Sequence, residues 1–245
     1  MMIAWFLAQQ ILPPRLKHII VTILLIAIPA ALIARQPDLG TALLVASSGF
    51  FVLFLAGLPW WFLGLSAAGL AAIAPVAWHF LHDYQRQRIL TLIDPQSDPL
   101  GTGWNIIQSK TAIGSGGLTG KGWLNGTQAH LEFLPEGHTD FIIATYSEEF
   151  GWLGILVLLT LYSLIIGRCL YIASHANDTY RRLLAGAISL SFFVYVFVNA
   201  GMVSGILPVV GVPLPFISYG GTAMLTLMSG FGVLMAIHTH QQNLD

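Results

Sequence analysis

Asp140 is the residue whose type and setting most directly suggest acid–base chemistry. It ends the run Pro-Glu-Gly-His-Thr-Asp, in which Glu136 and His138 lie close by, and a long apolar stretch follows it. A carboxylate held where lipid meets water has its pKa raised by the low dielectric, toward that of a useful general base. Thr139 or Asp140 could instead simply cap the helix that follows. The two interpretations are compatible.

Asp38 is a second acid with two interpretations. It lies in the run Gln-Pro-Asp-Leu-Gly-Thr, where Pro-Asp forms a good helix start, so capping is the simpler role. Alternation of the membrane spans described below places Asp38 on the same outer side as Asp140. An outward-facing cavity could then hold both carboxylates. A divalent cation such as Mg or Mn could be shared between them, because hard ions prefer oxygen ligands.

Four cations on the same outer side could bind an anion. Arg86 and Arg88 lie at the end of an apolar stretch, where snorkelling anchors are the default interpretation and diphosphate binding is the sharper one. Lys110 and Lys121 accompany a glycine-rich run, 114–122, which fails both the Walker pattern and the dinucleotide fingerprint. A turn that holds an anionic group and a solvated loop fit this run equally well.

Glu148 and Glu149 lie one or two helical turns inside the apolar stretch after Asp140. Adjacent helical residues point about 100° apart, so both cannot face one cavity. A charge at the bilayer centre costs roughly 2.5–3.5 kcal/mol on insertion scales. We therefore expect the pair at the outer interface or in a groove used by a partner helix, and the sequence does not decide between the two.

The composition indicates the kind of protein that must position these residues. Of the 245 residues 56% are hydrophobic and 9% are charged, with 10 basic and 11 acidic side chains, whereas soluble domains carry roughly 25% charged residues. This composition excludes a soluble enzyme, a disordered chain and a binder of nucleic acid. The single cysteine, Cys169, excludes a disulfide framework. The class is an all-α polytopic membrane protein.

About six stretches are apolar and long enough to span a bilayer, which takes about 20 residues. They are residues 18–34, 40–58, 60–81, 150–172, 183–203 and 222–237. Residues 1–10 are expected to be the end of a further span whose beginning is absent. The whole chain, 1–245, is expected to form one membrane domain.

The positive-inside rule assigns the two sides of the membrane. Basic residues gather in 13–18 and 173–182, so these connections are cytoplasmic. Residues 82–140 then lie outside as a long extracytoplasmic loop, which is too apolar for disorder and is expected to contain short interfacial helices. The other outer connection, 205–221, is apolar but broken by prolines and glycines. Unwound backbone of this kind is tolerated where it lines a cavity, although a plain hairpin is the simpler interpretation.

Taken together, the motifs of this sequence resemble those of the SEDS family over essentially the whole chain. They are Gln36-Pro-Asp-Leu-Gly40, Asp83-Tyr-Gln-Arg-Gln-Arg88, Asp94-Pro95, Ser109-Lys-Thr-Ala-Ile-Gly-Ser-Gly-Gly117, Glu132-Phe-Leu-Pro-Glu-Gly-His-Thr-Asp-Phe141, Glu148-Glu-Phe-Gly151, Asn199-Ala-Gly-Met202, Pro208-Val-Val-Gly-Val-Pro-Leu-Pro215 and Ser218-Tyr-Gly-Gly221. Their order and spacing both match, and the ending Ile-His-Thr-His240 favours the branch of cell elongation over that of division.

The resemblance implies a peptidoglycan glycosyltransferase of the bacterial cytoplasmic (inner) membrane, with its active site facing the periplasm. Such proteins polymerise lipid II into glycan strands for cell elongation and rod shape. A sugar hydroxyl attacks an anomeric carbon with inversion, and undecaprenyl diphosphate leaves. The implied partners are lipid II, membrane lipids, the elongation machinery and a class B penicillin-binding protein, a transpeptidase.

The resemblance also implies residue roles. The essential acid of the family falls on Asp140, while Asp38 and Ser218 line the same cavity. We assign Arg86, Arg88, Lys110 and Lys121 to the diphosphate by inference from their charge, and we place Glu136 and His138 beside the substrate. The residues expected to bind the substrate are therefore Asp38, Arg86, Arg88, Lys110, Lys121, Glu136, His138 and Ser218.

One departure from the family bears on the activity. Family members have about ten spans, and the early spans, which carry residues of the same cavity, are missing from this sequence. The chain alone is therefore expected to be inactive or unstable. Two other functions stay open: a flippase that moves lipid II, because broken helices and intramembrane acids suit a transporter, and a non-catalytic activator of the transpeptidase.

Overall fold

The structure is a computed structural model that describes residues 1–36, 38–80, 83–98, 101–130, 133–134 and 136–242. All its regular elements within these ranges are helices. The motif residues Pro37, Glu132 and Pro135 lie outside the described residues. By its internal contacts the chain divides into two compact units, which we describe one at a time. The prediction of a single membrane domain stays a prediction.

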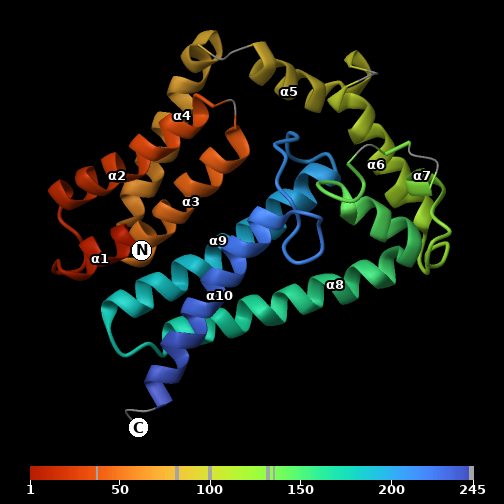
Figure 1. The fold of residues 1–245 in the computed structure, drawn as a ribbon. Helices are drawn as coiled ribbons and strands as arrows, with labels where there is room; N and C mark the ends of the chain where they lie inside the picture. The colour runs from red at the N-terminus through yellow and green to blue at the C-terminus, as the bar shows by residue number, and fades with distance from the viewer. Residues whose placement is uncertain (37, 81–82, 99–100, 131–132, 135, 243–245) are drawn as a thin grey trace. The chain divides into compact units, whose positions relative to one another are not determined.

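The first unit comprises residues 1–80, 165–194 and 226–245. It contains α1 (Met2–Ala8), α2 (Leu16–Ala34), α3 (Leu39–Leu55) and α4 (Trp60–Phe80), and the helices α2 and α3 pack against each other (Figure 1). It also holds the end of α8 (Ile142–Ser174), most of α9 (Thr179–Val203) and most of α10 (Gly221–Gln242). Its helices therefore come from three separate parts of the sequence.

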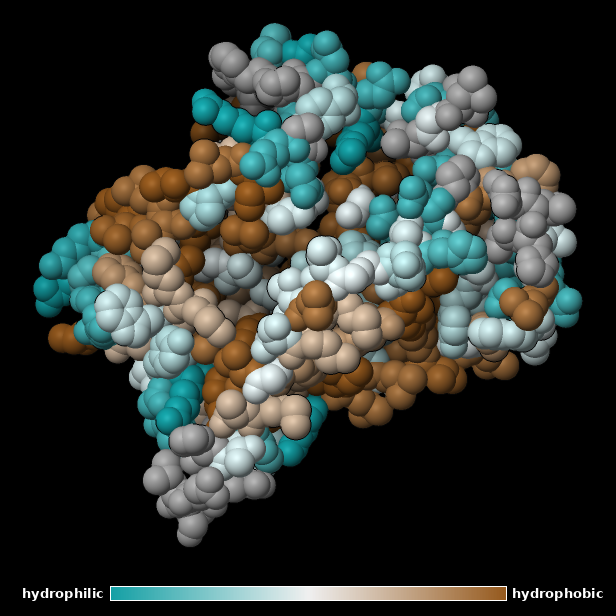
Figure 2. All heavy atoms as spheres, viewed as in Figure 1, coloured by the Kyte–Doolittle hydropathy of each residue, from teal (hydrophilic) through white to brown (hydrophobic). Residues whose placement is uncertain are grey.

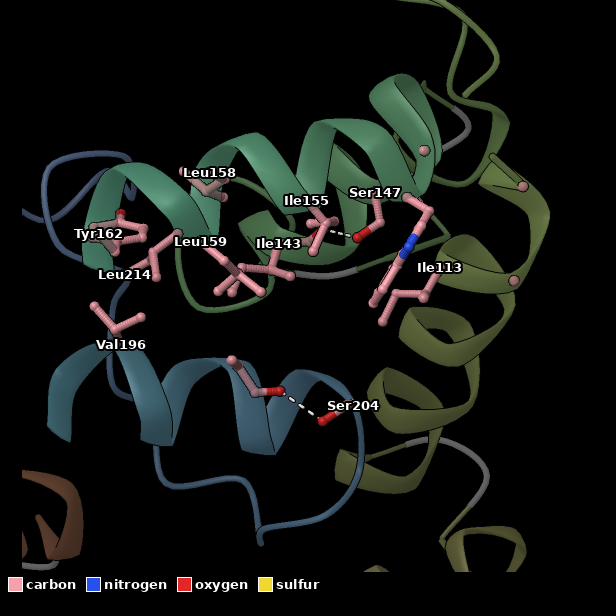
Figure 3. A pocket seen from close by; sticks show the side chains of 15 residues that line it. Ile113, Ile143, Ser147, Ile155, Leu158, Leu159, Tyr162, Val196, Ser204 and Leu214 are labelled. Carbon is pink, nitrogen blue, oxygen red and sulfur yellow. Dashed lines mark hydrogen bonds between the residues drawn. The ribbon is translucent and has the colours of Figure 1, made fainter. Parts of the chain in front are cut away.

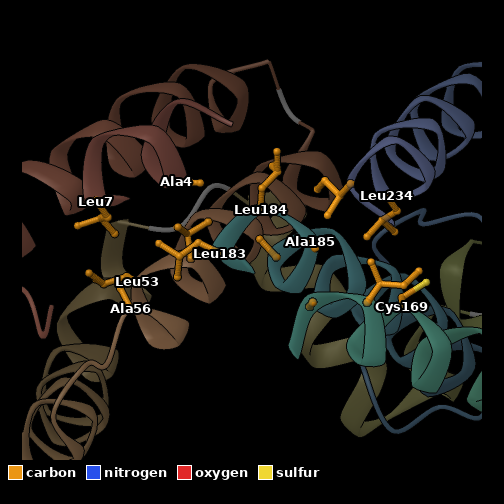
Figure 4. Close-up of a cluster of buried hydrophobic side chains, with 14 of the residues drawn as sticks. Ala4, Leu7, Leu53, Ala56, Cys169, Leu183, Leu184, Ala185 and Leu234 are labelled. Atoms are coloured by element: carbon orange, nitrogen blue, oxygen red, sulfur yellow. The ribbon is translucent and has the colours of Figure 1, made fainter. Parts of the chain in front are cut away.

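Small and branched apolar side chains form the core of this unit. Leu7 and Leu53 meet Leu183 and its neighbours in one buried cluster, and Leu234 joins it from α10 (Figure 4). Cys169 is buried in the same cluster as a small apolar side chain. The close approach of helices in such a core follows from packing, because lipid supplies no hydrophobic drive between them.

The second unit comprises residues 81–164 and 195–225, and it holds the predicted outer loop. The loop contains α5 (Asp83–Ile93), a 3-10 turn (Pro95–Ser97), α6 (Thr102–Gly116) and α7 (Thr127–His130). The prediction of short helices in this segment is confirmed. Their position at the membrane surface stays a prediction.

All six predicted spans are helical over most of their described residues. Among the described residues, four helices are long and apolar enough to cross a membrane, namely α2, α8, α9 and residues 221–239 of α10, while α3 and the start of α4 are shorter apolar helices. Large apolar side chains of α8, such as Trp152, Leu156 and Leu161, are exposed, and Figure 2 shows a largely apolar surface along this helix. Exposed apolar surface of this extent is typical of contact with lipid. The prediction of an all-α polytopic membrane protein is confirmed.

Candidate active site

Asp140 lies in a tight turn that immediately precedes α8. Glu136 begins the turn with a φ of 60°, which is rare for a residue with a side chain. Its carbonyl oxygen accepts hydrogen bonds from the amides of Thr139 at 3.0 Å and Phe141 at 3.1 Å. Phe141 is 1% exposed and anchors the end of the turn in the core of the second unit. These contacts fix the backbone on both sides of Asp140.

Three consecutive carbonyl groups of this turn accept hydrogen bonds from α9 and from the segment that follows it. The amide of Tyr219 donates to His138 O at 3.0 Å, and Ser218 Oγ donates to Thr139 O at 2.5 Å. Asn199 Nδ2 donates to Asp140 O at 2.8 Å. The connection after α9 is non-helical from 204 to 220, as predicted, and it serves here as one wall of the Asp140 site. Its location outside the membrane stays a prediction.

The Asp140 carboxylate itself makes no hydrogen bond or ion pair with any described residue. It is half-buried, and burial together with the nearby charge of Glu136 raises the pKa of Asp140 above its ordinary value. A Cβ atom on Gly211 would lie 3.5 Å from Asp140 Oδ2, and the φ of 76° at Gly211 also favours glycine. The site therefore combines a fixed backbone with a carboxylate that is free to take a proton.

The two capping predictions have opposite outcomes. Asp38 Oδ1 accepts a hydrogen bond from Thr41 N at 3.0 Å, so Asp38 caps α3 as expected. The prediction that Thr139 or Asp140 caps α8 is wrong, because neither side chain accepts a bond from an α8 amide within the described residues. Thr139 Oγ1 donates to Glu136 instead. Asp38 lies in the first unit, so its pairing with Asp140 stays a prediction.

The other residues predicted beside the substrate have distinct surroundings. Glu136 and His138 are exposed in the Asp140 turn. Ser218 is engaged within the protein, since its hydroxyl accepts from Leu214 N at 2.8 Å while it donates to Thr139 O. A substrate-binding role for Ser218 stays a prediction, and the contacts point to a part in shaping the turn.

The four predicted diphosphate ligands are spread over the second unit. Arg86 Nη1 lies 3.9 Å from Asp83 Oδ1 on α5, and the Arg88 guanidinium lies 5.9 Å from the centre of the Tyr84 ring. Lys110 extends from α6 over Gly205, where the non-helical segment begins. A diphosphate role for these three residues stays a prediction.

Lys121 is paired with Glu148, which is fully buried. Glu148 Oε1 accepts from Lys121 Nζ at 2.6 Å, and from the amide and the hydroxyl of Thr127 at 2.9 Å each. The amide of Gln128 donates to Oε2 at 3.1 Å, and Ser115 Oγ lies 3.4 Å from Oε1. Glu148 is thus an internal anchor that ties α6 and α7 to α8, and it is not exposed to a partner helix. Its position relative to the membrane interface stays a prediction.

The glycine-rich run 114–122 packs backbone to backbone against a break in α8. At Gly151 φ is 65° and ψ is −163°, so the helix is interrupted there. Backbone hydrogen bonds of 2.9–3.0 Å join the two segments: Lys121 N–Glu148 O, Gly122 N–Glu149 O, Trp152 N–Gly117 O and Leu153 N–Leu118 O. A side chain on Gly116, Gly120 or Gly151 would collide with the opposite backbone. The run is therefore not a plain solvated loop, because two of its amides and two of its carbonyl groups bond to α8. An anion-binding role for it stays a prediction.

An apolar cavity of about 420 Å³ lies between α6, α8 and α9 in the second unit (Figure 3). Ile113, Ile155, Leu159 and Val196 line it, together with Tyr162, whose hydroxyl donates to Pro215 O at 2.6 Å. Asp140 does not line it. A cavity with these walls suits neither a sugar nor a diphosphate, so the polar part of a substrate must bind elsewhere.

Sequence reasoning missed two residues that shape this site. Asn199 was part of a family motif, yet nothing predicted that its amide would reach the Asp140 turn. The available signal was a single amide side chain near the end of an apolar span, where an unpaired polar group is costly. The anchor role of Glu148 was also missed, since its partners lie 20 to 33 residues away in the sequence.

Comparison with curated proteins gives one consistent result. The family of cell cycle proteins FtsW/RodA/SpoVE matches residues 1–243. The peptidoglycan glycosyltransferase MrdB of Escherichia coli K12 is 60% identical over 246 residues, which cover 100% of this chain and 66% of that protein. The protein of the same name from Helicobacter pylori is 43% identical over 85% of this chain and 54% of its own length. The chain thus spans about two thirds or less of the length of these relatives.

Comparison with solved structures agrees. A structure described as "Structural coordination of polymerization and crosslinking by a peptidoglycan synthase complex" matches with a TM-score of 0.82 and 31% identity, over 98% of this chain and 66% of that one. The rod shape determining protein RodA of Thermus thermophilus matches with a TM-score of 0.65 and 27% identity, over 98% of this chain and 63% of that one. The helical arrangement is therefore shared with known membrane proteins.

Proposed function

Because this chain belongs to the FtsW/RodA/SpoVE family of cell cycle proteins, we propose that it is part of a peptidoglycan glycosyltransferase that polymerises lipid II for cell elongation. The single observation that carries the proposal is the Asp140 carboxylate, which has no partner among the described residues and lies on a backbone held by three hydrogen bonds. The names of the relatives, which include peptidoglycan glycosyltransferase MrdB, support the same function.

In the proposed reaction Asp140 is the general base. It takes the proton from the sugar hydroxyl of one lipid II or glycan molecule, and the resulting oxygen attacks the anomeric carbon of another. The bond between that carbon and the diphosphate oxygen breaks, and undecaprenyl diphosphate leaves with the bonding electrons. The raised pKa of Asp140 suits this role, because a stronger base takes the proton more readily near neutral pH.

The leaving diphosphate needs cations near its oxygen atoms. Arg86, Arg88 and Lys110 are the proposed ligands, since each carries its charge on the segment that precedes the Asp140 turn. Lys121 is a weaker candidate because Glu148 already compensates its charge.

A divalent cation, Mg or Mn, is a further proposal. Among the described residues no three His, Cys, Asp or Glu side chains gather where they could hold a metal ion. Asp140 and Glu136 could share one only with oxygens from water or substrate.

The protein is a multi-pass membrane protein, and we propose that its site faces the periplasm. Support comes from the basic connections of 13–18 and 173–182, which the positive-inside rule assigns to the cytoplasm, and from the position of Asp140 just before a span. We also propose a class B penicillin-binding protein as partner within the elongation machinery. The match to a structure described as a synthase complex of polymerization and crosslinking supports this partner.

The test is glycan synthesis by the protein as the cell makes it, purified and supplied with labelled lipid II. We expect polymer from the wild type and none above background from Asp140→Asn. Asp178→Asn is a matched control, because Asp178 is an exposed acid that caps α9 and asparagine caps equally well. Equal polymer from Asp140→Asn and wild type would refute the assignment. Passage of lipid II across vesicles without any polymer would favour the flippase instead.

A further inference from the structure

We infer that Asn199 is a positioning residue of this site: it locks the backbone of Asp140 to the non-helical segment after α9 and so holds the carboxylate in place for reaction. The inference rests on the proposed role of Asp140 as the base. It assigns a function to a polar residue near the C-terminal end of α9, four positions before the last residue of that helix, Val203.

The contacts of Asn199 are specific to this position. The side chain is fully buried, and Nδ2 donates to Asp140 O at 2.8 Å and to Val212 O at 2.7 Å. Because both partners are carbonyl oxygens, only the NH2 end of the amide can face them, and the orientation of the amide is determined. One side chain thus joins the turn of the acid to the facing segment.

The amide oxygen of Asn199, Oδ1, indicates that this side chain does more than fill space. Asn199 Oδ1 is buried and has no hydrogen-bond partner among the described residues. A buried acceptor without a partner is unfavourable, and an apolar side chain at this position would avoid that cost. The two donated bonds offset it, which is consistent with a polar group whose purpose is to hold two carbonyl groups.

Asn199 also completes a set of three donors. Tyr219 N and Ser218 Oγ hold the carbonyls of His138 and Thr139, and Asn199 holds the next carbonyl. Asn199 is the member that comes from a helix, so it provides the rigid reference to which the turn and the segment are both fixed. Helices place functional groups more exactly than loops do.

Loss of Asn199 should therefore affect the chemical step more than binding. The carbonyls of Asp140 and Val212 would lose their shared donor, and the Asp140 turn could shift against residues 211–219. A displacement of about 1 Å at a reacting group can cost about 10²-fold in rate. The residues proposed to bind the diphosphate are untouched, so the KM for lipid II should stay unchanged.

The decisive variant is Asn199→Ala in the protein as the cell makes it, with kcat and KM measured on labelled lipid II. We expect kcat to fall by about 10²-fold with KM unchanged. Asn199→Ser is expected to recover part of the rate, since a hydroxyl can donate to one of the two carbonyls. Ser204→Ala is the matched control directly after α9, because among the described residues the Ser204 hydroxyl bonds only to carbonyls of the last turn of α9.

A pH profile separates positioning from a general loss of structure. The titratable residues of the Asp140 turn are Glu136 and His138, and Tyr219 is the titratable residue whose amide bonds to this turn. If the turn loosens, water reaches the carboxylate, so the acid limb of the kcat profile should move to lower pH in Asn199→Ala and stay in place in Ser204→Ala. A merely unstable protein would lose amplitude at every pH without a shift of this limb.

Several results would overturn the inference. They are a folded Asn199→Ala protein with the kcat of Ser204→Ala, or an acid limb that does not move. If Asn199→Ala does not fold, as judged by its melting curve in detergent, Asn199→Ser alone decides: wild-type kcat and pH profile would refute positioning. Full activity of Asp140→Asn would instead refute the proposed function, so the two failures are distinguishable.

Discussion

Asp140 and Glu148 are two carboxylates eight residues apart in the second unit, and they have opposite surroundings. Glu148 is fully buried and accepts hydrogen bonds from Lys121, Thr127 and Gln128. Asp140 is half-buried, and its carboxylate accepts none from the described residues. The backbone of Asp140, in contrast, is held by a side chain: its carbonyl accepts a hydrogen bond from Asn199 of α9.

The difference separates a structural acid from a reactive one. A buried carboxylate keeps its charge only when its oxygen atoms are fully hydrogen-bonded, and it then has no capacity left for a substrate. A carboxylate that is partly desolvated, fixed through its backbone and free at its oxygens has the properties of a base. Both acids lie in family motifs, so the sequence pattern alone would not tell one role from the other.

The largest expected effect is on catalysis, and it should divide the two acids. Asp140→Asn should lower the rate of glycan synthesis by about 10²–10⁴-fold, which is the usual contribution of a general base. Glu148→Gln, measured per folded protein, should retain most of its rate because Glu148 does not touch the substrate in this proposal. Comparable losses of rate per folded molecule in the two variants would remove the distinction.

The next effect is on stability, with the order of the two acids reversed. Glu148→Ala should lower the free energy of unfolding by about 3–5 kcal/mol, since it removes one member of a buried ion pair and leaves several donors without an acceptor. Melting in detergent of Glu148→Ala and Asp140→Ala would measure it. Glu149→Ala is the matched control, because Glu149 is only half-buried. A melting temperature of Glu148→Ala equal to that of the control would contradict the anchor role.

Much of the fold could be predicted because apolar length is a local property of the sequence. The six apolar stretches are mostly helical, and α9 ends before the prolines and glycines of 205–221, as expected. The helix break at Gly151 was not predicted, because glycine is common in membrane helices and does not by itself indicate a break. Its cause is the run 114–122, which bonds to the broken turn, and that pairing is not local.

The acid of the site could be predicted from the sequence, but the residues that hold its backbone could not. Asp140 could be selected from its place beside an apolar stretch and from the family motif. Its turn could not, because Glu136 adopts a positive φ without being glycine, and this geometry removed the capping role expected for Thr139. The contacts of Asn199 and Lys121 cross 59 and 27 residues of sequence, and no periodicity predicts contacts over such distances.

Lys121→Met tests the anchor role of Glu148 by removing its cationic partner. It leaves Glu148 buried with its remaining donors, so the free energy of unfolding should fall by about 1.5–3 kcal/mol, the usual value for a hydrogen bond to a charged group. This is less than for Glu148→Ala. Lys110→Met serves as the control because Lys110 is exposed and makes no hydrogen bond among the described residues. If Lys121 instead binds the diphosphate, the KM for lipid II would rise while the melting temperature stayed constant.

The smallest expected effect is a gain of stability in Asp140→Asn. Burial and Glu136 raise the pKa of Asp140, so the folded protein binds this proton more tightly than the unfolded chain does. The stability that this proton contributes is present at low pH and is lost as pH rises from the ordinary pKa through the raised one. At neutral pH the ionised carboxylate therefore lowers the free energy of unfolding. Asparagine removes that charge. Asp140→Asn should therefore melt slightly above the wild type at pH 7 and equal to it or below it in acid, whereas Glu148→Gln should melt below the wild type at pH 7. A lower melting temperature of Asp140→Asn at pH 7 would mean that the carboxylate has a stabilising partner after all, and Asp140 would then resemble Glu148.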